Sequence, residues 1–433
     1  MKHLPLPGGV GRTQSAKLKE PLLPSPKLDL ARIRSEFPAL ASGTVFLDNA
    51  GGSQVLARVA NRISHYLLHD NVQHGASYLA SQQAGERVLS ARRAIATLVN
   101  AAHDDEIVMG PSTTALIGTL VDALRPGLQA GDEVIVTESD HEANIGAWAR
   151  LAQVGVVVRV WPVDVLSLGL RLEDLDPLIG PRTKWIAMTH ASNVLGTVNP
   201  VTEVARRAHA VGARLCVDAV AYAPHRLVDV QACEADAVVF SFYKVFGPHY
   251  AVLWVKRDLL LSLPSLNHFF IGPDVIPYKL QLGNVNYELS YGCAGIADYL
   301  KDVGTELGAL GDDRSRMQTA FDAFAHHEDA LAEQVLSWLR DRRGVRIIGL
   351  PSVAAGERVP TISFVVDGLQ SEAIVRRVDA HGIGIRFGDF YARRLIEALG
   401  LQAYGGVVRI SIAHYNTSEE MDRLLMALDE ALT

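Results

Sequence analysis

The feature that most constrains the fold of this 433-residue chain is a repeated alternation of short apolar segments with helical stretches. Six segments rich in β-branched and aromatic residues follow one another along the chain, most of them about 20–30 residues apart. They are residues 133–137, 154–161, 184–189, 214–217, 237–240 and 251–255. Stretches such as VGVVVRVW and ADAVVFSF are apolar almost throughout, which is typical of strands covered on both faces. Because helices between successive strands act as crossover connections, the pattern predicts an α/β fold around a mostly parallel sheet.

The length of the chain predicts more than one domain. After about residue 302 the pattern changes to a long helix through residue 342, a few short strands and flanking helices, which is typical of a small α+β domain. We expect a large domain over residues 28–300, with its N-terminal segment packed on a small C-terminal domain over residues 301–433. Residues 1–27 are rich in Pro, Gly, Lys and Leu without a clear period, and we expect a mobile arm there.

Charge and composition exclude several classes of partner. The net charge of −7 gives neither the basic footprint of a nucleic-acid-binding protein nor a polybasic membrane surface. No stretch approaches the ~20 consecutive apolar residues of a membrane span. The three cysteines lack CxxC spacing, which favours a reducing compartment and predicts a cytoplasmic protein. We therefore expect a small-molecule partner, with no nucleic acid, no membrane and no metal.

Lys244 and Asp218 each follow an apolar segment, where the carboxyl ends of parallel strands meet and ligands bind. A desolvated lysine there has a lowered pKa and can form a Schiff base, although a lysine that simply reaches solvent fits the position as well. Asp218 is suited to hold the ring nitrogen of pyridoxal phosphate protonated, and its alternative is an N-cap.

Two further segments fit a site at the same edge of the sheet. His141 follows another expected strand and is placed to stack on a cofactor ring, or to be an ordinary loop histidine. Ser112, Thr113 and Thr114 precede an apolar run and predict a helix N-terminus, whose hydroxyl and N–H groups suit a phosphate. A simple Ser/Thr cap explains the same letters.

The motifs FLDNAGGSQV, GPSTTALI, SDHEANIGAW, THASNVLGTVNP, VDAVAYAPH, SFYKVFGPH, GNVNYE and VVRISIAHYNT occur in this order. Their order and spacing over roughly residues 46–432 resemble the class V aminotransferase, or cysteine desulfurase-like, family. The resemblance implies a pyridoxal-phosphate enzyme of fold type I, in which a large domain with a mostly parallel seven-stranded sheet is joined to a small C-terminal α+β domain. It also implies an amino-acid substrate and a homodimer with active sites at the interface.

The resemblance assigns expected roles to individual positions. Lys244 matches the Schiff-base lysine, Asp218 the partner of the ring nitrogen and His141 the stacking histidine. Arg409 matches the arginine that binds the substrate carboxylate, where a bidentate fork is suitable. Expected cofactor ligands also include Ser112, Thr113, Thr114, Asn193, Ser241, Tyr243 and, toward the partner subunit, Asn284. Expected substrate contacts also include Asn193, His74, Arg386 and Tyr391.

The chain departs from the family pattern at the position of the desulfurase nucleophile. Where desulfurases carry a cysteine that accepts sulfur, this chain reads RFGDFYA, with Tyr391 in place of the cysteine. Relay of a persulfide through that position is therefore excluded, and Cys293 is the only other cysteine worth considering. Ala221 replaces a glutamine that contacts the cofactor's phenolic oxygen, and Tyr243 replaces a histidine and is a possible acid–base group.

These departures favour a C–S lyase that acts by β-elimination on a cysteine-derived or S-conjugated amino acid, with Lys244, His141 and Tyr391 as catalytic residues. Transamination and epimerisation remain alternatives, a true cysteine desulfurase is a weaker one, and a non-catalytic domain is disfavoured because the key residues are retained. We expect the side-chain pocket at Gln73, His74, Gly75, Tyr78, Phe387, Asp389, Phe390 and Tyr391. Asp389 would suit a cationic or hydroxylated substrate, or only cap a turn.

Overall fold

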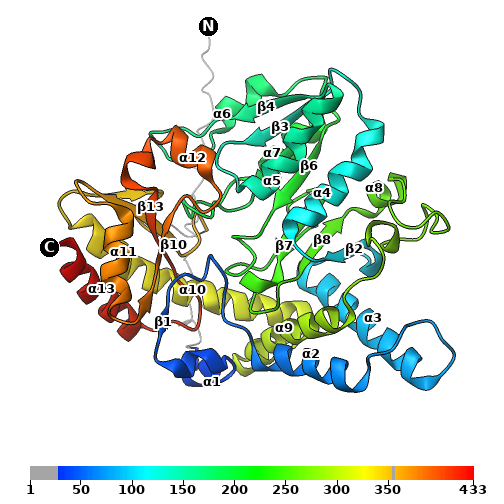
Figure 1. Cartoon of the computed structure of the whole chain (residues 1–433), viewed down its shortest axis with the longest axis horizontal. Coiled ribbons are helices and arrows are strands. Elements are labelled where there is room, and N and C mark those ends of the chain that lie inside the picture. The colour runs from blue at the N-terminus through cyan, green and yellow to red at the C-terminus, as the bar shows by residue number, and fades with distance from the viewer. Residues whose placement is uncertain (1–27, 354–355) are drawn as a thin grey trace, which may run out of the picture.

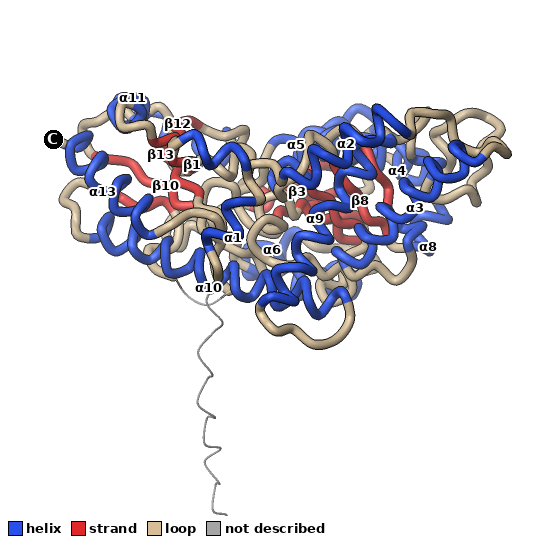
Figure 2. The backbone as a smooth tube through the Cα atoms, turned by 90° about the horizontal axis from the view of Figure 1, so that it is seen from below, coloured by secondary structure: helices blue, strands red, loops and turns tan. Residues whose placement is uncertain are grey.

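The structure is a computed structural model that describes residues 28–353 and 356–433. The arm expected at residues 1–27 lies outside the described residues. Figure 1 shows a large parallel-stranded part and a smaller part formed by the C-terminal third of the chain. Seen from below, the two sheets lie side by side, with helices around each (Figure 2).

The large sheet has seven strands in the order β2-β8-β7-β6-β5-β3-β4. β8 is antiparallel to both of its neighbours and the other pairs are parallel, which confirms the mostly parallel sheet expected from the sequence. Its strands are β2 (Ile107–Gly110), β3 (Glu133–Thr137), β4 (Val157–Trp161), β5 (Thr183–Thr189), β6 (Arg214–Asp218), β7 (Ala237–Ser241) and β8 (Ala251–Val255).

Helices cover both faces of this sheet, so alternate strand residues enter different hydrophobic cores. Val238 packs in a core with α2, α3, α7 and α9, whereas Val239 packs in a core with α4, α5 and α8. This two-sided burial is the physical reason that the strands are apolar throughout. The helices are α2 (Ala57–His69), α3 (Leu79–Val99), α4 (Thr113–Leu124), α5 (Glu142–Ala149), α6 (Leu172–Leu175), α7 (Val201–Ala210), α8 (Arg257–Ser262) and α9 (Tyr287–Glu306).

The C-terminal part is a four-stranded antiparallel sheet in the order β12-β13-β10-β9, packed against α10, α11 and α13. This is the small α+β architecture that the sequence predicts. The strands are β9 (Val345–Ile348), β10 (Thr361–Val366), β12 (Arg386–Gly388) and β13 (Val407–Ser411). The helices are α10 (Asp313–Arg340), α11 (Ser371–Asp379), α12 (Arg393–Ala398) and α13 (Ser418–Leu432).

Some boundaries differ from those expected. The helix expected from residue 302 to 342 is two helices, because Gly308 and Gly311 adopt positive φ after α9 and the side chain of Asp312 caps α10. Residues 154–156 precede β4, and β2 is a strand that the sequence pattern did not reveal. The domain boundary expected at residue 300 falls within α9, and the division into domains stays a prediction.

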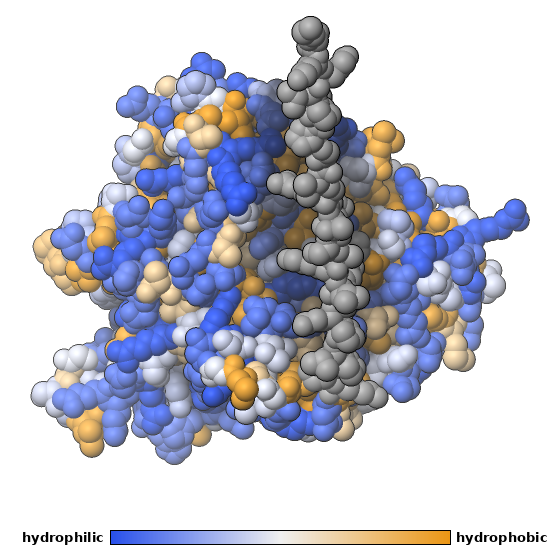
Figure 3. Space-filling model, turned by 180° about the vertical axis from the view of Figure 1, so that it is seen from behind, coloured by the Kyte–Doolittle hydropathy of each residue, from blue (hydrophilic) through white to orange (hydrophobic). Residues whose placement is uncertain are grey.

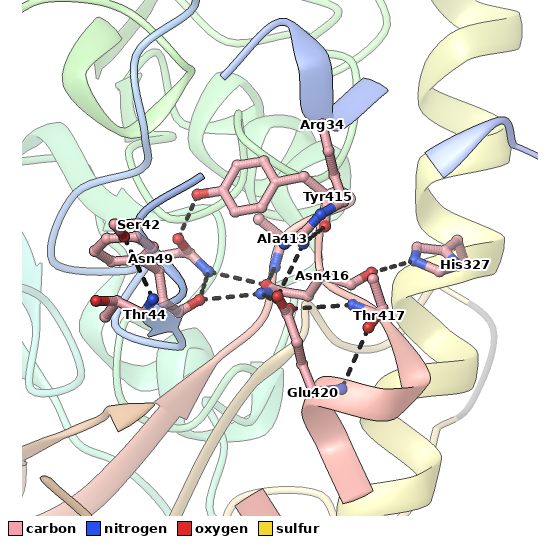
Figure 4. Close-up of polar contacts among 11 residues, drawn as sticks. Arg34, Ser42, Thr44, Asn49, His327, Ala413, Tyr415, Asn416, Thr417 and Glu420 are labelled. Carbon is pink, nitrogen blue, oxygen red and sulfur yellow. Dashed lines mark hydrogen bonds and ion pairs between the residues drawn. The ribbon is translucent and has the colours of Figure 1, made fainter. Parts of the chain in front are cut away.

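The segment before α2 joins the small sheet region to the large one. β1 (Val45–Phe46) pairs in parallel with β11 (Ile383–Gly384), and α1 (Leu30–Ser35) lies nearby. Asn49 donates a hydrogen bond to Asn416 Oδ1 at 3.2 Å (Figure 4), and Asn416 donates one to the Phe46 carbonyl at 3.1 Å. Arg34 donates to the Tyr415 carbonyl at 2.7 Å and forms an ion pair with Glu420 at 2.9 Å. These contacts fix the position of the intervening residue, Asp48.

The surface carries several exposed apolar side chains, among them the adjacent Phe269 and Phe270. Within residues 28–353 and 356–433, no helix is both long and apolar enough to cross a membrane. Figure 3 shows hydrophobic residues scattered among hydrophilic ones on the face that it draws. Large exposed side chains include Leu166 and Leu310. Single exposed apolar residues of this kind are normal in globular proteins.

Candidate active site

The expected site residues converge at the carboxyl edge of the large sheet. Each of five strands ends in a residue of the site or in a loop that carries one, because parallel strands deliver their carboxyl ends to one edge. A cavity with about 530 Å³ of empty volume opens there to solvent. Nine of the expected residues line it: Ser112, Thr113, Thr114, His141, Asn193, Asp218, Ser241, Tyr243 and Lys244.

Lys244 is buried at the end of the turn that follows β7, with 6% of its surface exposed. Burial and the positive charge of Arg409 lower the pKa of its amine to about 8, although Asp218 and Asp48 act in the opposite direction. About a tenth of the amine is therefore uncharged at pH 7, far more than for a lysine with its ordinary pKa. That is the state in which a lysine attacks an aldehyde.

Asp218 ends β6 and is 4% exposed. Its Oδ1 accepts a hydrogen bond from the Val220 N–H at 2.8 Å. Burial raises the pKa of the carboxyl to about 6, while that hydrogen bond and the charge of Lys244 lower it. A buried carboxylate that borders a cavity is stabilised by a cationic partner, so Asp218 suits the protonated ring nitrogen of the expected cofactor.

A phosphate cradle forms where α4 begins. Ser112 is the N-cap of this helix, and its hydroxyl accepts a hydrogen bond from the Ala115 N–H at 3.2 Å. The hydroxyls of Thr113 and Ser241 lie 2.6 Å apart, although 128 residues separate them in the chain. Free N–H groups and the helix dipole favour an anion at such an end. The buried amine, the buried carboxylate and this cradle fit pyridoxal phosphate.

His141 is the N-cap of α5 and borders the same cavity. Its Nδ1 accepts a hydrogen bond from the Ala143 N–H at 3.0 Å, which fixes the ring. Burial, Lys244 and Arg409 lower the pKa of His141 to about 4, against an opposing effect of Asp389. The imidazole is therefore neutral at physiological pH, which suits a residue that stacks on a ring.

Arg409 lies in β13 and is 2% exposed. It forms a 2.8 Å ion pair with Asp48, and its Nη1 donates to the Asn193 carbonyl at 3.2 Å. Its Nε is buried and has no partner among the described residues. Arg386 also approaches Asp48, at 3.5 Å. A buried guanidinium with an unpaired N–H is suited to bind a carboxylate.

Sequence analysis did not single out Asp48. It stands in the motif FLDNAGG, which contributed to the family resemblance, but nothing in the order of the letters shows that it meets two arginines of the small sheet. The pairing arises because β1 lies beside β11, which brings Asp48, two residues after β1, next to Ser411 of β13. A contact between residues more than 300 positions apart is a product of tertiary structure.

The loop of residues 388–392 lies at the edge of the cavity, in contact with His141 and Asn193, which line it. Asn193 Nδ2 donates to the Phe390 carbonyl at 2.9 Å, and the Glu142 N–H donates to the Tyr391 carbonyl at 2.8 Å. The Phe390 ring centroid is 3.7 Å from the Arg409 guanidinium. Tyr391 lies beside His141, with 5.3 Å between ring centroids, but is 70% exposed. The structure thus places Tyr391 at the edge of the site.

His74 and Asn284 do not line the Lys244 cavity. His74 stacks on Tyr287 with 3.6 Å between ring centroids and shares a 2.8 Å hydrogen bond with the hydroxyl of Tyr66. Asn284 accepts a hydrogen bond from the Tyr278 hydroxyl at 3.3 Å. His74 and Asn284 border a second cavity, and the expected contact of Asn284 with the phosphate of a partner subunit stays a prediction, as does the substrate contact of His74.

The other positions at which the sequence departs from the family pattern lie in or near the cavity or are buried. Tyr243 lines the cavity and stacks on His249, with 5.0 Å between centroids, and burial raises the pKa of its phenol. Ala221 lines the cavity as well. All three cysteines are buried, and burial raises the pKa of the Cys293 thiol well above its ordinary value. A protonated, buried thiol is a poor sulfur acceptor.

Comparisons with known proteins agree with this geometry. The model of the family described as aminotransferase class-V matches residues 45–424. An aminotransferase-like protein of Gibberella zeae is 39% identical over 94% of this chain and all of its own length. A cysteine desulfurase-like protein of Aspergillus flavus is 31% identical over 94% of this chain and 91% of its own. The crystal structure of a cysteine desulfurase from Escherichia coli superposes with a TM-score of 0.80 at 29% identity, covering 94% of this chain and 98% of that one.

Proposed function

The chain belongs to the class V aminotransferase family of pyridoxal-phosphate-dependent enzymes, and we propose that it cleaves the C–S bond of a cysteine-derived amino acid by β-elimination. The observation that carries this proposal is the composition of the loop at the cavity edge. By the family resemblance Tyr391 stands where desulfurases carry the sulfur acceptor, and Cys216, Cys233 and Cys293 are all buried. Sulfur leaving the substrate has no accessible thiol in this chain to accept it.

Different residues of the site bind the substrate carboxylate, the ring nitrogen of the cofactor and its phosphate. Arg409, with its unpaired Nε, binds the α-carboxylate, and the Asn193 backbone holds the guanidinium in place. Asp218 keeps the ring nitrogen of the cofactor protonated through its buried charge. The Thr113 and Ser241 hydroxyls and the start of α4 bind the phosphate.

Lys244 carries the proton transfer at Cα. The bound cofactor supplies an electron sink that stabilises negative charge at the substrate Cα. The Lys244 amine, whose pKa burial lowers to about 8, is placed to remove the Cα proton. The electron pair then forms a Cα–Cβ double bond as the Cβ–S bond breaks, and the sulfur leaves with both bonding electrons. Protonation of the thiolate and hydrolysis of the remaining fragment give a thiol, pyruvate and ammonia.

The test uses purified holoenzyme and an S-alkyl-L-cysteine. We expect pyruvate and the alkyl thiol to appear in equal amounts, with the cofactor spectrum returning to its starting form at the end. Lys244→Ala is the matched control, which should release neither product. Formation of an α-keto acid that retains the sulfur would contradict β-elimination.

A second candidate function is transamination, which the name of the 39% identical aminotransferase-like relative favours. It uses the same proton at Cα, but Lys244 would return the proton to the cofactor carbon, so the Cβ–S bond would stay intact. This reaction would convert the cofactor to its amine form and would depend on an added keto acid. Epimerisation would instead return the proton to the opposite face of Cα and yield the D-amino acid.

We also propose that the active enzyme is a homodimer. The predicted phosphate contact of Asn284 is not made within the subunit, and His74 lies beside the same loop. Their placement is consistent with a contribution to the partner's site. Light scattering of the holoenzyme should give twice the 46.9 kDa chain mass, and Asn284→Ala should weaken cofactor binding. A monomer with full activity would exclude the shared site. A cytoplasmic location stays a prediction.

A further inference from the structure

The charges around Arg409 match one carboxylate. Arg409 and Arg386 bring two positive charges to the part of the site that we assign to the substrate carboxylate, which we call the arginine wall. Asp48 pairs with both arginines, at 2.8 and 3.5 Å. The net charge of the three groups is therefore +1, which an α-carboxylate neutralises. A second carboxylate on the substrate side chain would have no remaining charge to pair with on this wall.

The loop of residues 388–392 carries a negative charge, at Asp389, that forms no close ion pair with any described residue. Asp389 precedes the two aromatic residues of the loop, and among the described residues its carboxylate makes no ion pair within 4.0 Å. Its Oδ1 accepts a hydrogen bond from the Tyr391 N–H at 3.0 Å, which is a local turn contact. A neutral backbone donor does not cancel its charge.

The arginines that flank Asp389 in sequence are engaged elsewhere. Arg386 pairs with Asp48, Arg393 with Glu397 at 2.9 Å, and Arg394 with Glu142 at 3.1 Å. The nearby imidazole of His141 is neutral, because burial first and then the charges of Lys244 and Arg409 lower its pKa to about 4. The close ion pairs of these arginines are thus with other carboxylates, although the charge of Asp389, after the hydrogen bond and charge of Glu397, also helps to raise the pKa of the Arg393 guanidinium.

The loop holds Asp389 in a defined place. Phe390 and Tyr391 both have positive φ, 53° and 58°, which is unusual for bulky residues and must be supported by surrounding contacts. Asn193 and the Glu142 backbone bind the carbonyls of these two residues, and Arg409 lies against the Phe390 ring. The loop is therefore tied to the walls of the cavity at consecutive residues.

The proposed contacts at both ends of the substrate place it beside this loop. With its amino group at Lys244 and its carboxylate at Arg409, as proposed above, the substrate lies next to the loop of residues 388–392, because the Phe390 ring of that loop is 3.7 Å from the Arg409 guanidinium. The same loop carries the ring of Tyr391, which lies 5.3 Å from that of His141 and keeps 70% of its surface exposed. An exposed aromatic face next to a carboxylate is a favourable environment for an ammonium or guanidinium group.

We propose that the physiological substrate carries a cationic group on its side chain, and that the Asp389 carboxylate and the Tyr391 ring bind that group. This proposal rests on the proposed function in one respect: the test compounds are chosen as substrates for β-elimination. It makes Asp389 a specificity-determining residue. The expected substrate is then a longer, basic amino acid and not a small neutral one.

The test compares three S-conjugates that differ mainly in charge. S-(2-aminoethyl)-L-cysteine is cationic, S-propyl-L-cysteine is its neutral isostere, and S-carboxymethyl-L-cysteine is anionic. Two quantities are measured for each: Kd, from the change in cofactor absorbance on binding, and kcat/KM, from pyruvate release. We expect the cationic compound to bind about tenfold more tightly than the neutral isostere at low salt, and the difference to shrink as ionic strength rises.

Asp389→Asn is the decisive variant, because asparagine keeps an oxygen for the Tyr391 N–H but removes the charge. It should abolish the preference for the cation while leaving Kd for the neutral isostere within about twofold. Asp379→Asn is the matched control, since Asp379 is an exposed aspartate at the end of α11 and its loss removes the same charge.

The outcomes separate this inference from the proposed function. Equal Kd values for the cationic and neutral compounds, or a preference that Asp389→Asn leaves unchanged, would overturn the inference. Absence of pyruvate from all three compounds, with a cation preference in Kd that Asp389→Asn removes, would overturn β-elimination and support the cationic substrate.

Discussion

Replacing Lys244 should make the protein without cofactor more stable. Lys244 is 6% exposed, and burial first, then the charge of Arg409, lowers the pKa of its amine from 10.5 to about 8. Holding the ammonium form in the folded protein at pH 7 therefore costs about 3 kcal/mol relative to the unfolded chain. Lys244→Met removes this cost and keeps an apolar chain of similar length, so we expect the apo variant to gain about 2–3 kcal/mol.

The stability difference between Lys244→Met and the parent should depend on pH. Below pH 8 the lysine is protonated in both states, and the full cost is present. Between pH 8 and 10.5 the folded protein releases its proton first, so the unfolded chain binds more protons and the stability of the parent rises with pH. The advantage of Lys244→Met should therefore shrink from pH 7 toward pH 10.

The assay is urea unfolding of both apo proteins, followed by circular dichroism at several pH values. Lys279→Met is the matched control, because Lys279 is fully buried but donates hydrogen bonds to the carbonyls of Leu263 at 2.7 Å and Pro273 at 2.8 Å. Its loss leaves those carbonyls without a donor and should destabilise the protein by about 1–3 kcal/mol. If Lys244→Met were instead less stable than the parent at pH 7, the amine would not be desolvated as argued here.

Four further predictions concern the reaction. Arg409→Ala should raise KM for the amino acid about 30-fold or more, with cofactor retained, and unchanged steady-state kinetics would remove Arg409 from the site. Because burial raises the pKa of Asp218 to about 6 in the protein without cofactor, cofactor affinity should fall as pH drops below 6 and the carboxylate is neutralised; an affinity that is unchanged down to pH 5 would count against this carboxylate. Tyr391→Phe should lower kcat with unchanged KM if the phenol protonates the leaving group, whereas its 70% exposure leads us to expect a change mainly in KM. Cys293→Ser should match the parent in thiol release, since burial keeps its thiol protonated, and loss of thiol release would identify Cys293 as an acceptor.

The large sheet and its site were predictable because both follow from local patterns. Apolar runs such as that of β7 reflect burial on two faces, and a lysine or aspartate directly after such a run must lie at the carboxyl edge of the sheet. The positions of Lys244 and Asp218 at this edge could therefore be predicted from the strand ends alone. Their roles in catalysis rest on the family resemblance and stay predictions.

Long-range contacts were not predictable in this way. The pairing of Asp48 with Arg409 depends on β1 meeting β11, and the support of the 388–392 loop depends on Asn193 and Glu142, which lie about 200 residues or more away. Short elements were also missed. β2 has only four residues, too few to show a period, and the break between α9 and α10 depends on glycine conformations that the apolar pattern does not reveal.

The central claim, that sulfur leaves without passing through the protein, is tested most directly by product analysis during turnover of L-cysteine. The account predicts pyruvate, ammonia and sulfide in equal amounts, and an intact protein mass that stays unchanged in samples quenched during the reaction. Alanine as the carbon product, together with a gain of about 32 Da on a cysteine of the chain, would contradict it and identify a desulfurase.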